Sequence, residues 1–178
     1  LISSNSFESI ILYIALIRSK CAVFIIDDNV NLINFLELFN NYQPNYIVCP
    51  KNFLKKTGEI KLSLKNSFGE YNILENNNKI KHSINENLML LLPTSGSLGS
   101  PKYVKLSFNN ILENTISISE YLNFNDSHRT ITTMPMSYSY GISIINTHLF
   151  NGGSLVVNNR SFFDAKFWEK YLKLKINN

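Results

Sequence analysis

The sequence has few of the residues that build disulfide scaffolds and metal centres, and it has no apolar run long enough to span a membrane. Among its 178 residues are 2 cysteines and 3 histidines, with no pair at a metal-binding spacing. The longest apolar run, residues 10–17, is far shorter than the roughly 20 residues that cross a bilayer. We therefore expect no metal ligands and no membrane span, and we expect surface or capping roles for His82, His128 and His148.

The two cysteines bear on where the protein works. Cys21 and Cys49 both lie in apolar, strand-like runs. This context favours buried free thiols in a reducing compartment over a disulfide. We therefore predict a cytoplasmic protein.

The charge of the chain is positive but not concentrated. A net charge of +4 raises the question of a nucleic-acid partner. However, the lysines are dispersed, and no basic run is interleaved with aromatic residues. We expect a mildly basic solvated surface and no nucleic-acid partner. The apolar share of 44% is enough for a core and is incompatible with disorder.

The order of apolar periods indicates an α/β fold with a mainly parallel sheet flanked by helices and a short antiparallel insertion. The first part predicts a β-α-β unit followed by two half-exposed antiparallel strands. The expected elements there are a helix capped by Asn5 and Glu8 that reaches Lys20, a buried strand at residues 21–26, a helix that ends before Pro44, a strand at 46–49, and antiparallel strands at 60–64 and 80–84.

The second part of the chain alternates strands and helices. Ser107 is a good helix cap, and Gly152 with Gly153 is a good helix stop. The expected strands lie at residues 88–92, 103–106, 130–134 and 155–157, and the expected helices at 107–122, 139–150 and 164–174.

A loop rich in hydroxyl groups and glycine joins the strands at 88–92 and 103–106; it reads Thr94-Ser95-Gly96-Ser97-Leu98-Gly99-Ser100-Pro101-Lys102. Glycine permits positive φ and close backbone approach, so successive N–H groups can converge on an anion. The hydroxyl groups add donors, and Lys102 adds a positive charge. The ordinary nucleotide P-loop is excluded, because Gly99 is followed by Ser-Pro-Lys. A phosphate-binding loop and a plain surface turn both remain open.

The loop resembles T-S-G-[ST]-T-G-x-P-K, the signature of the acyl-adenylate-forming superfamily of acyl-CoA synthetases, adenylation domains and luciferases. The one departure is Leu98, where Thr or Gly is usual. Residues 132–141 and 151–157 resemble the family's P-x-x-H-x-x-G segment and the strand after it, with Tyr138 in place of the His. Residues 107–114 and 11–26 resemble the helix after the loop and the start of the nucleotide domain. The resemblance spans nearly the whole chain.

The resemblance implies an enzyme that activates a carboxylic acid as acyl-AMP and releases pyrophosphate. The residues that it implies as holders of the β- and γ-phosphates of ATP, with Mg²⁺ neutralising the remaining charge, are Thr94, Ser95, Gly96, Ser97, Gly99 and Lys102. Lys102 and Tyr138 are the implied catalytic residues. Tyr138 would border the acid's carboxylate, and Gly141 would let a ligand approach the backbone. Ordinary packing at the edge of the sheet is the alternative for Met136, Tyr138 and Tyr140.

The substrate and the acyl acceptor are less defined. No Asp lies between Met134 and Gly153, whereas domains that activate α-amino acids usually carry one near this segment. A fatty, aryl or other simple acid is therefore expected, with CoA, a carrier protein or an amine as acceptor.

Several motifs of the family are absent from the chain: the adenine-binding Y-G-x-[ST]-E, the ribose-binding T-G-D, the hinge and the late catalytic Lys. We therefore expect residues 1–178 to be the N-terminal portion of an AMP-binding domain, incomplete at both ends and inactive alone. A non-catalytic domain that keeps the fold for binding or assembly is the alternative, which the departures at Pro93, Leu98 and Tyr103 favour.

Overall fold

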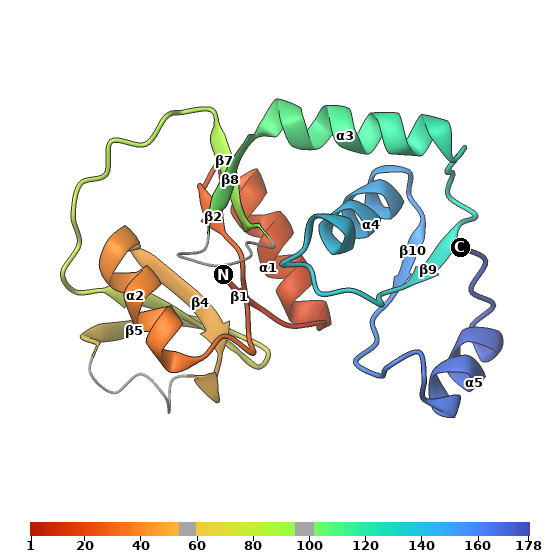
Figure 1. The fold of residues 1–178 in the computed structure, drawn as a ribbon, viewed down its shortest axis with the longest axis horizontal. Coiled ribbons are helices and arrows are strands. Elements are labelled where there is room, and N and C mark those ends of the chain that lie inside the picture. The colour runs from red at the N-terminus through yellow and green to blue at the C-terminus, as the bar shows by residue number, and fades with distance from the viewer. Residues whose placement is uncertain (54–59, 95–101) are drawn as a thin grey trace.

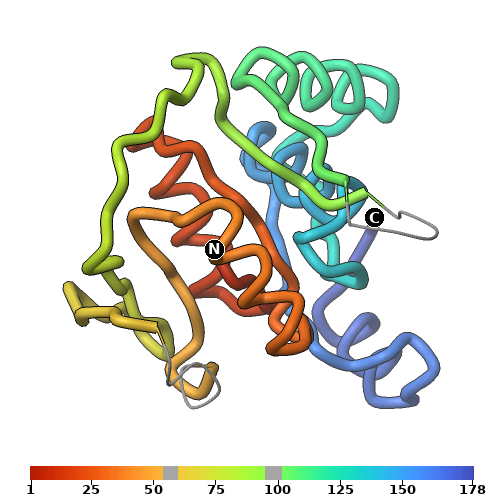
Figure 2. The backbone as a smooth tube through the Cα atoms, turned by 60° about the vertical axis from the view of Figure 1, so that its left-hand side comes forward, coloured from red at the N-terminus to blue at the C-terminus, as the bar shows by residue number. Residues whose placement is uncertain are grey.

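The computed structural model describes residues 1–53, 60–94 and 102–178, which form small sheets flanked by helices (Figure 1). Three strand pairs are parallel: β1 (Ile2–Ser3) with β3 (Ile26–Asp27), β2 (Val23–Phe24) with β7 (Leu88–Pro93), and β9 (Arg129–Ile131) with β10 (Ser154–Val156). The predicted α/β class is confirmed. Figure 2 shows the first half of the chain on one side of the molecule and residues beyond α3 on the other.

Helix α1 (Phe7–Arg18) opens the fold and packs into the main core. Its N-cap is Ser6, whose Oγ accepts a hydrogen bond from the N–H of Ser9 at 3.1 Å. The predicted cap at Asn5 was therefore wrong by one residue, because Ser6 supplies the oxygen that the first turn needs. The core cluster around this helix comprises Ile10, Tyr13, Val23, Ile25, Leu90, Leu92, Met136, Ile142 and Ile145.

The strand expected at residues 21–26 is divided between β2 and β3. Ile25 lies between them and is fully buried. The apolar pattern therefore predicted burial correctly, but it did not predict that the strand is divided. The chain turns at Lys20, whose φ is +55°, and this leaves Cys21 exposed. Only Cys49 is a buried thiol, and burial raises its pKa to about 11, which keeps it protonated. The prediction that both thiols are buried is wrong for Cys21, and the prediction that both are free is confirmed.

The strand at residues 46–50 pairs with a different strand from the one that the sequence predicted. Helix α2 (Leu32–Tyr42), capped by Asn31, leads to β4 (Tyr46–Pro50), which pairs antiparallel with β6 (Tyr71–Asn76) rather than with β2 or β3. β5 (Leu62–Phe68) pairs with the other edge of β6. Residues 79–85, where a strand was expected at 80–84, form no strand. Gly69, with a φ of +54°, makes a tight turn that brings β6 onto β5 first.

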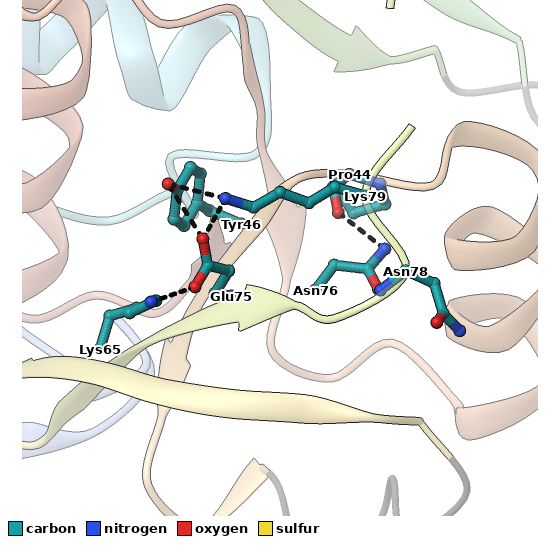
Figure 3. Close-up of polar contacts among 7 residues, drawn as sticks. All are labelled: Pro44, Tyr46, Lys65, Glu75, Asn76, Asn78 and Lys79. Carbon is teal, nitrogen blue, oxygen red and sulfur yellow. Dashed lines mark hydrogen bonds and ion pairs between the residues drawn. The ribbon is translucent and has the colours of Figure 1, made fainter. Parts of the chain in front are cut away.

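Charged and amide side chains fix this small sheet at one end (Figure 3). The Glu75 carboxylate forms ion pairs with Lys65 and Lys79, and the Lys79 ammonium lies 4.8 Å from the centre of the Tyr46 ring. The buried Asn76 side chain donates to the carbonyl oxygen of Pro44 at 3.1 Å. These polar contacts join the strands of the sheet β4-β6-β5 to one another and to the residues that flank them.

The rest of the chain alternates helices and strands as expected. β7 pairs antiparallel with β8 (Tyr103–Ser107), and Ser107 caps α3 (Phe108–Tyr121) in a reciprocal pair with Asn110. Helix α4 (Ser139–Phe150) lies below α3 in Figure 1, and α5 (Ala165–Lys173) lies beyond the β9-β10 pair. The helix expected at residues 164–174 is present as α5, and Asp164 is its N-cap. Within residues 1–53, 60–94 and 102–178, no helix combines the length and apolar character needed to cross a bilayer.

Candidate functional site

The described ends of the predicted phosphate loop are held together. Both the N–H and the Oγ1 of Thr94 donate to the carbonyl oxygen of Lys102, at 2.9 and 3.1 Å. Pro93 faces Tyr103 in the antiparallel pair just before this closure. The chain therefore leaves β7 and enters β8 at one point. Ser95, Gly96, Ser97 and Gly99 lie outside the described residues, so their contact with phosphate stays a prediction.

The loop starts at the carboxyl end of a buried parallel strand. Leu90 and Leu92 of β7 are buried in the main core, and β7 runs parallel to β2. The carboxyl edge of parallel strands is where α/β folds place their ligands. Thr94 and Lys102 are exposed there, and none of the described carboxylates forms an ion pair with Lys102. The lysine is thus available to an anion.

Residues 134–141, part of the second predicted segment (132–141), are fixed by contacts from two earlier elements. Met136 is 1% exposed, and its Sδ accepts a hydrogen bond from the Oγ of Ser9 in α1 at 3.2 Å. The neighbouring Ser137 donates to Oδ2 of Asp27 at 3.2 Å. Asp27 also accepts from the N–H of Asn29 through Oδ1, at 2.9 Å, and so forms a turn at the end of β3. Its tie to Ser137 was not foreseen, because 110 residues separate the two.

Tyr138 lies at the beginning of α4 with its side chain half exposed. Its N–H donates to the carbonyl oxygen of Pro135 at 3.1 Å, and its side chain makes no capping hydrogen bond. Tyr138 is 52% exposed and Tyr140 63%, whereas Met136 is in the core. The packing alternative therefore describes Met136. The role of Tyr138 toward an acid stays a prediction.

Gly141 faces the backbone of its own segment. A Cβ added at this residue would lie 2.2 Å from the carbonyl oxygen of Pro135 and 2.9 Å from that of Met134. Real Cβ atoms essentially never come closer than 3.0 Å to such atoms. Glycine is thus required here by the crossing of α4 over residues 134–135. Close approach of a ligand to Gly141 stays a prediction.

Two cavities adjoin these segments, and the sequence predicted neither. A largely apolar groove of about 1040 Å³ lies between α3, α4, α5 and β9, and Leu92, Ile111, Met134, Ile142 and Trp168 are among its lining residues. The helical spacing of Ile111 and Ile118 on α3 was the one available signal. A polar cavity of about 430 Å³ lies at the carboxyl ends of β1, β3 and β10, next to Ser3, Asp27, Asn158 and Arg160.

His148 corrects a prediction of a surface or capping role. It is 2% exposed near the end of α4, against the ring of Phe124, with a centroid distance of 4.7 Å. Its Nδ1 donates to the carbonyl oxygen of Ile144 at 2.8 Å, which leaves Nε2 as a hydrogen-bond acceptor. Burial lowers the pKa of His148, so the neutral ring is favoured. The helix stripe Ile144, Thr147, His148 carried no distinctive sequence signal. Within the described ranges, no cluster of three or more His, Cys, Asp and Glu residues could hold a metal ion.

Comparison with known protein families identifies the family of this chain. The sequence model for the AMP-binding enzyme matches residues 1–177. The chain belongs to the AMP-binding enzyme family. The family that the sequence resembles is thereby confirmed.

Two curated relatives of this AMP-binding chain are much longer proteins. The chain is 36% identical over 109 residues to a very long-chain fatty acid transport protein of Cochliobolus heterostrophus, which covers 58% of this chain and 17% of that protein. It is 30% identical over 89 residues to an oxalate–CoA ligase of Saccharomyces cerevisiae, which covers 49% of this chain and 16% of the ligase. The aligned regions are thus about a sixth of the length of each relative.

Solved structures share the fold of this AMP-binding chain. Apo MatB from Rhodopseudomonas palustris superimposes with a TM-score of 0.70 at 19% identity, over 97% of this chain and 36% of MatB. The O-succinylbenzoate CoA synthetase MenE from Bacillus subtilis, in complex with ATP and a magnesium ion, gives 0.73 at 15% identity, over 99% of this chain and 47% of MenE. The chain therefore spans less than half the length of either enzyme.

Proposed function

We propose that this chain is part of an ATP-dependent acid ligase that activates a carboxylic acid as acyl-AMP, releases pyrophosphate and transfers the acyl group to CoA. The observation that carries the proposal is the Thr94–Lys102 loop, closed at the carboxyl end of β7 in a chain of the AMP-binding enzyme family. Adenylation builds negative charge on the departing pyrophosphate, so preorganised donors and positive charge at such a loop supply the catalysis.

ATP and Mg²⁺ fit the residues that the structure describes. The ammonium group of Lys102 is exposed and forms no ion pair with a described carboxylate. The exposed Thr94 is hydrogen-bonded to the carbonyl oxygen of Lys102 and so lies beside it. Because no cluster of acidic or imidazole side chains for a metal occurs in the described residues, Mg²⁺ would enter with the phosphates of ATP. ATP with magnesium is present in the related MenE complex.

The acid is proposed to be a fatty or other simple carboxylic acid. Similarity to a very long-chain fatty acid transport protein and to an oxalate–CoA ligase supports an acid without an amino group. The ligase name also supports CoA as the acceptor, with a carrier protein or an amine as alternatives for the test. A cytoplasmic location, suggested by the two free cysteines, belongs to the same proposal.

The chain is proposed to be the N-terminal portion of the AMP-binding domain of a longer ligase. The decisive experiment measures acid-dependent exchange of labelled pyrophosphate into ATP by the full-length polypeptide, with acids of increasing chain length and with oxalate. We expect exchange by the full-length protein, acyl transfer to CoA, and no exchange by residues 1–178 alone. A full-length protein that binds ATP without exchanging pyrophosphate, for any acid, would favour the non-catalytic binding domain instead.

A second experiment tests Tyr138 as a wall of the acid site in the full-length enzyme. Tyr138→Phe removes only a hydroxyl from a half-exposed ring, so the melting temperature should hold. A hydroxyl that contacts the carboxylate would change KM or kcat for the acid while leaving KM for ATP unchanged. Tyr140→Phe, two residues away and similarly exposed, is the matched control. Equal kinetics for both variants would remove Tyr138 from the site.

A further inference from the structure

Two of the departures from the family signature, Pro93 and Tyr103, face each other across β7 and β8. The next pair toward the loop is Thr94 with Lys102, and its members share a backbone hydrogen bond. Pairs in an antiparallel ladder alternate between hydrogen-bonded and non-hydrogen-bonded, so Pro93 and Tyr103 form a pair of the second kind. The contacts that Tyr103 makes at this level of the sheet therefore come from its side chain.

The side chain of Tyr103 is held by two other aromatic rings. Its ring centre lies 4.5 Å from that of Phe24 in β2 and 5.8 Å from that of Tyr42, the last residue of α2. Phe24 and Tyr42 also contact each other, at 5.0 Å. All three contacts are edge-to-face, with interplanar angles of 74°, 78° and 86°, an arrangement that the charge distribution of aromatic rings favours. Each ring thus has two partners, and moving one breaks two contacts.

The aromatic cluster of Phe24, Tyr42 and Tyr103 lies on one face of the sheet β2-β7-β8. Phe24 is the register partner of Leu91 in β7, and Tyr103 is the partner of Pro93, the second residue after Leu91. Register partners and alternate residues of a strand share a face. Phe24 and Tyr103 therefore project from the same face and meet over β7, where Tyr42 joins them.

This cluster determines from which face of the sheet Lys102 projects. Successive residues of an extended segment alternate between faces, so Lys102 projects opposite to Tyr103. Burial, then Tyr42 and the charge of Glu37, raise the pKa of Tyr103, which places the Glu37 carboxylate near the cluster. A slip of one residue would bring Lys102 onto that face, toward a carboxylate instead of a phosphate. The ring of Tyr103, packed between its two partners, opposes such a slip.

We propose that Tyr103 is a positioning residue for adenylation: its ring, held by Phe24 and Tyr42, fixes the start of β8 so that Lys102 points to the phosphates of ATP. The departure at Tyr103 then belongs to a working site and is no sign of lost activity. This inference rests on the proposed function, because it assigns Lys102 to phosphate. Tyr103 contacts no reacting group, so its effect passes through the lysine.

Pyrophosphate exchange by the full-length enzyme tests the proposal with substitutions at Tyr103 and Lys102. Tyr103→Ala should lower kcat about tenfold by misplacing Lys102. Tyr103→Phe keeps the ring and should keep the rate. In the Lys102→Ala enzyme, Tyr103→Ala should cause no further loss, because the lysine through which the ring acts is absent. An equal loss in both backgrounds would show that Tyr103 acts on the fold as a whole and would overturn the proposal.

Phe39→Ala is the matched control for lost aromatic packing. Phe39 is partly buried and lies on α2 in the turn before Tyr42, but its ring contacts that of Phe35, 6.4 Å away. We expect Phe39→Ala to lower the melting temperature and leave kcat unchanged, whereas Tyr42→Ala should lower kcat as Tyr103→Ala does. If Tyr103→Ala fails to fold, Tyr103→Leu takes its place. Equal losses of kcat for Phe39→Ala and Tyr42→Ala would overturn the proposal.

Hydrogen exchange at the Thr94 amide separates this proposal from the proposed function, because it needs no catalysis. This N–H donates to the carbonyl oxygen of Lys102 and so reports whether the ends of the loop stay together. In the full-length protein we expect about tenfold faster exchange in Tyr103→Ala and no change in Tyr103→Phe. The Thr132 amide, bonded to β10, is the internal control. A Thr94 amide that does not respond to Tyr103→Ala would overturn the proposal. A Thr94 amide that responds, in a protein that does not exchange pyrophosphate, refutes only the proposed function.

Discussion

The phosphate loop and residues 134–141 are held by the fold in different ways, although both are predicted to face the same reaction. The described ends of the loop contact each other, through Thr94 and Lys102. Residues 134–141 contact α1 and β3 as well as the first turn of α4, through Ser9, Asp27 and Gly141. Substitutions at Met136, Ser137 and Gly141 should therefore act on stability, and substitutions at the loop should act on ligands.

The largest effect should come from Gly141→Ala. The new Cβ would overlap the carbonyl oxygen of Pro135 at 2.2 Å, and backbone on both sides would have to move. Overpacking of this kind costs about 3 kcal/mol or more. Urea unfolding of residues 1–178 measures it, with Ser139→Ala in the same turn as a control. A loss below about 1 kcal/mol would show that α4 shifts away from residues 134–135 easily.

Lys102→Ala tests whether a substitution at the phosphate loop acts on ligands rather than on stability. Lys102 is exposed and has no described ion-pair partner, so the stability of residues 1–178 should change little. In the full-length enzyme the lost charge-assisted hydrogen bond should slow pyrophosphate exchange about ten- to a hundredfold. Lys105→Ala, an exposed lysine on β8, is the control. Equal rates for the two variants would contradict a phosphate-binding loop at Lys102.

The tie between Asp27 and Ser137 should have an intermediate effect. A hydrogen bond to a carboxylate at this partly buried place should couple the two residues by about 1–2 kcal/mol. A double-mutant cycle with Asp27→Asn and Ser137→Ala, measured by urea unfolding of residues 1–178, isolates that coupling from other losses. Additive effects of the two substitutions would mean that β3 does not hold residues 134–141 in solution.

The smallest effect concerns the other end of α4. Because burial lowers the pKa of His148 below its ordinary value of 6.5, the unfolded chain binds a proton below pH 6.5 that the folded chain does not. Stability should therefore fall as the pH is lowered from 6.5 toward the depressed folded pKa, and it should be regained above 6.5. His148→Gln should flatten this part of the stability curve. An unchanged slope in that variant would assign the pH dependence to other groups.

Local signals in the sequence were sufficient for most helices and for the start of the phosphate loop. Three helices begin where the sequence predicted them, and their N-caps are Ser107, Asp164 and Asn31. A cap is a local feature, because it needs only a side-chain oxygen and the adjacent N–H groups. β7 and β8 also lie where apolar runs flank the loop. Such features depend on neighbours within a few residues.

The strand predictions were wrong where the pairing strand is distant along the chain. The apolar run at residues 21–26 predicted burial correctly, but burial does not say which strand lies alongside, and the run is split between β2 and β3. Residues 80–84 have an alternating pattern but form no strand, since β6 had already taken the place beside β5 after the turn at Gly69.

The sequence by itself determined the α/β class, the helices and the family signature of the loop, because these depend on periodicity, caps and motif spacing along the chain. Only the tertiary structure decided that Gly141 faces Pro135, that Asp27 holds Ser137, and that His148 is buried beside an open groove. Each of these depends on where two segments cross in space, and the packing of whole elements, rather than any local residue pattern, sets that crossing.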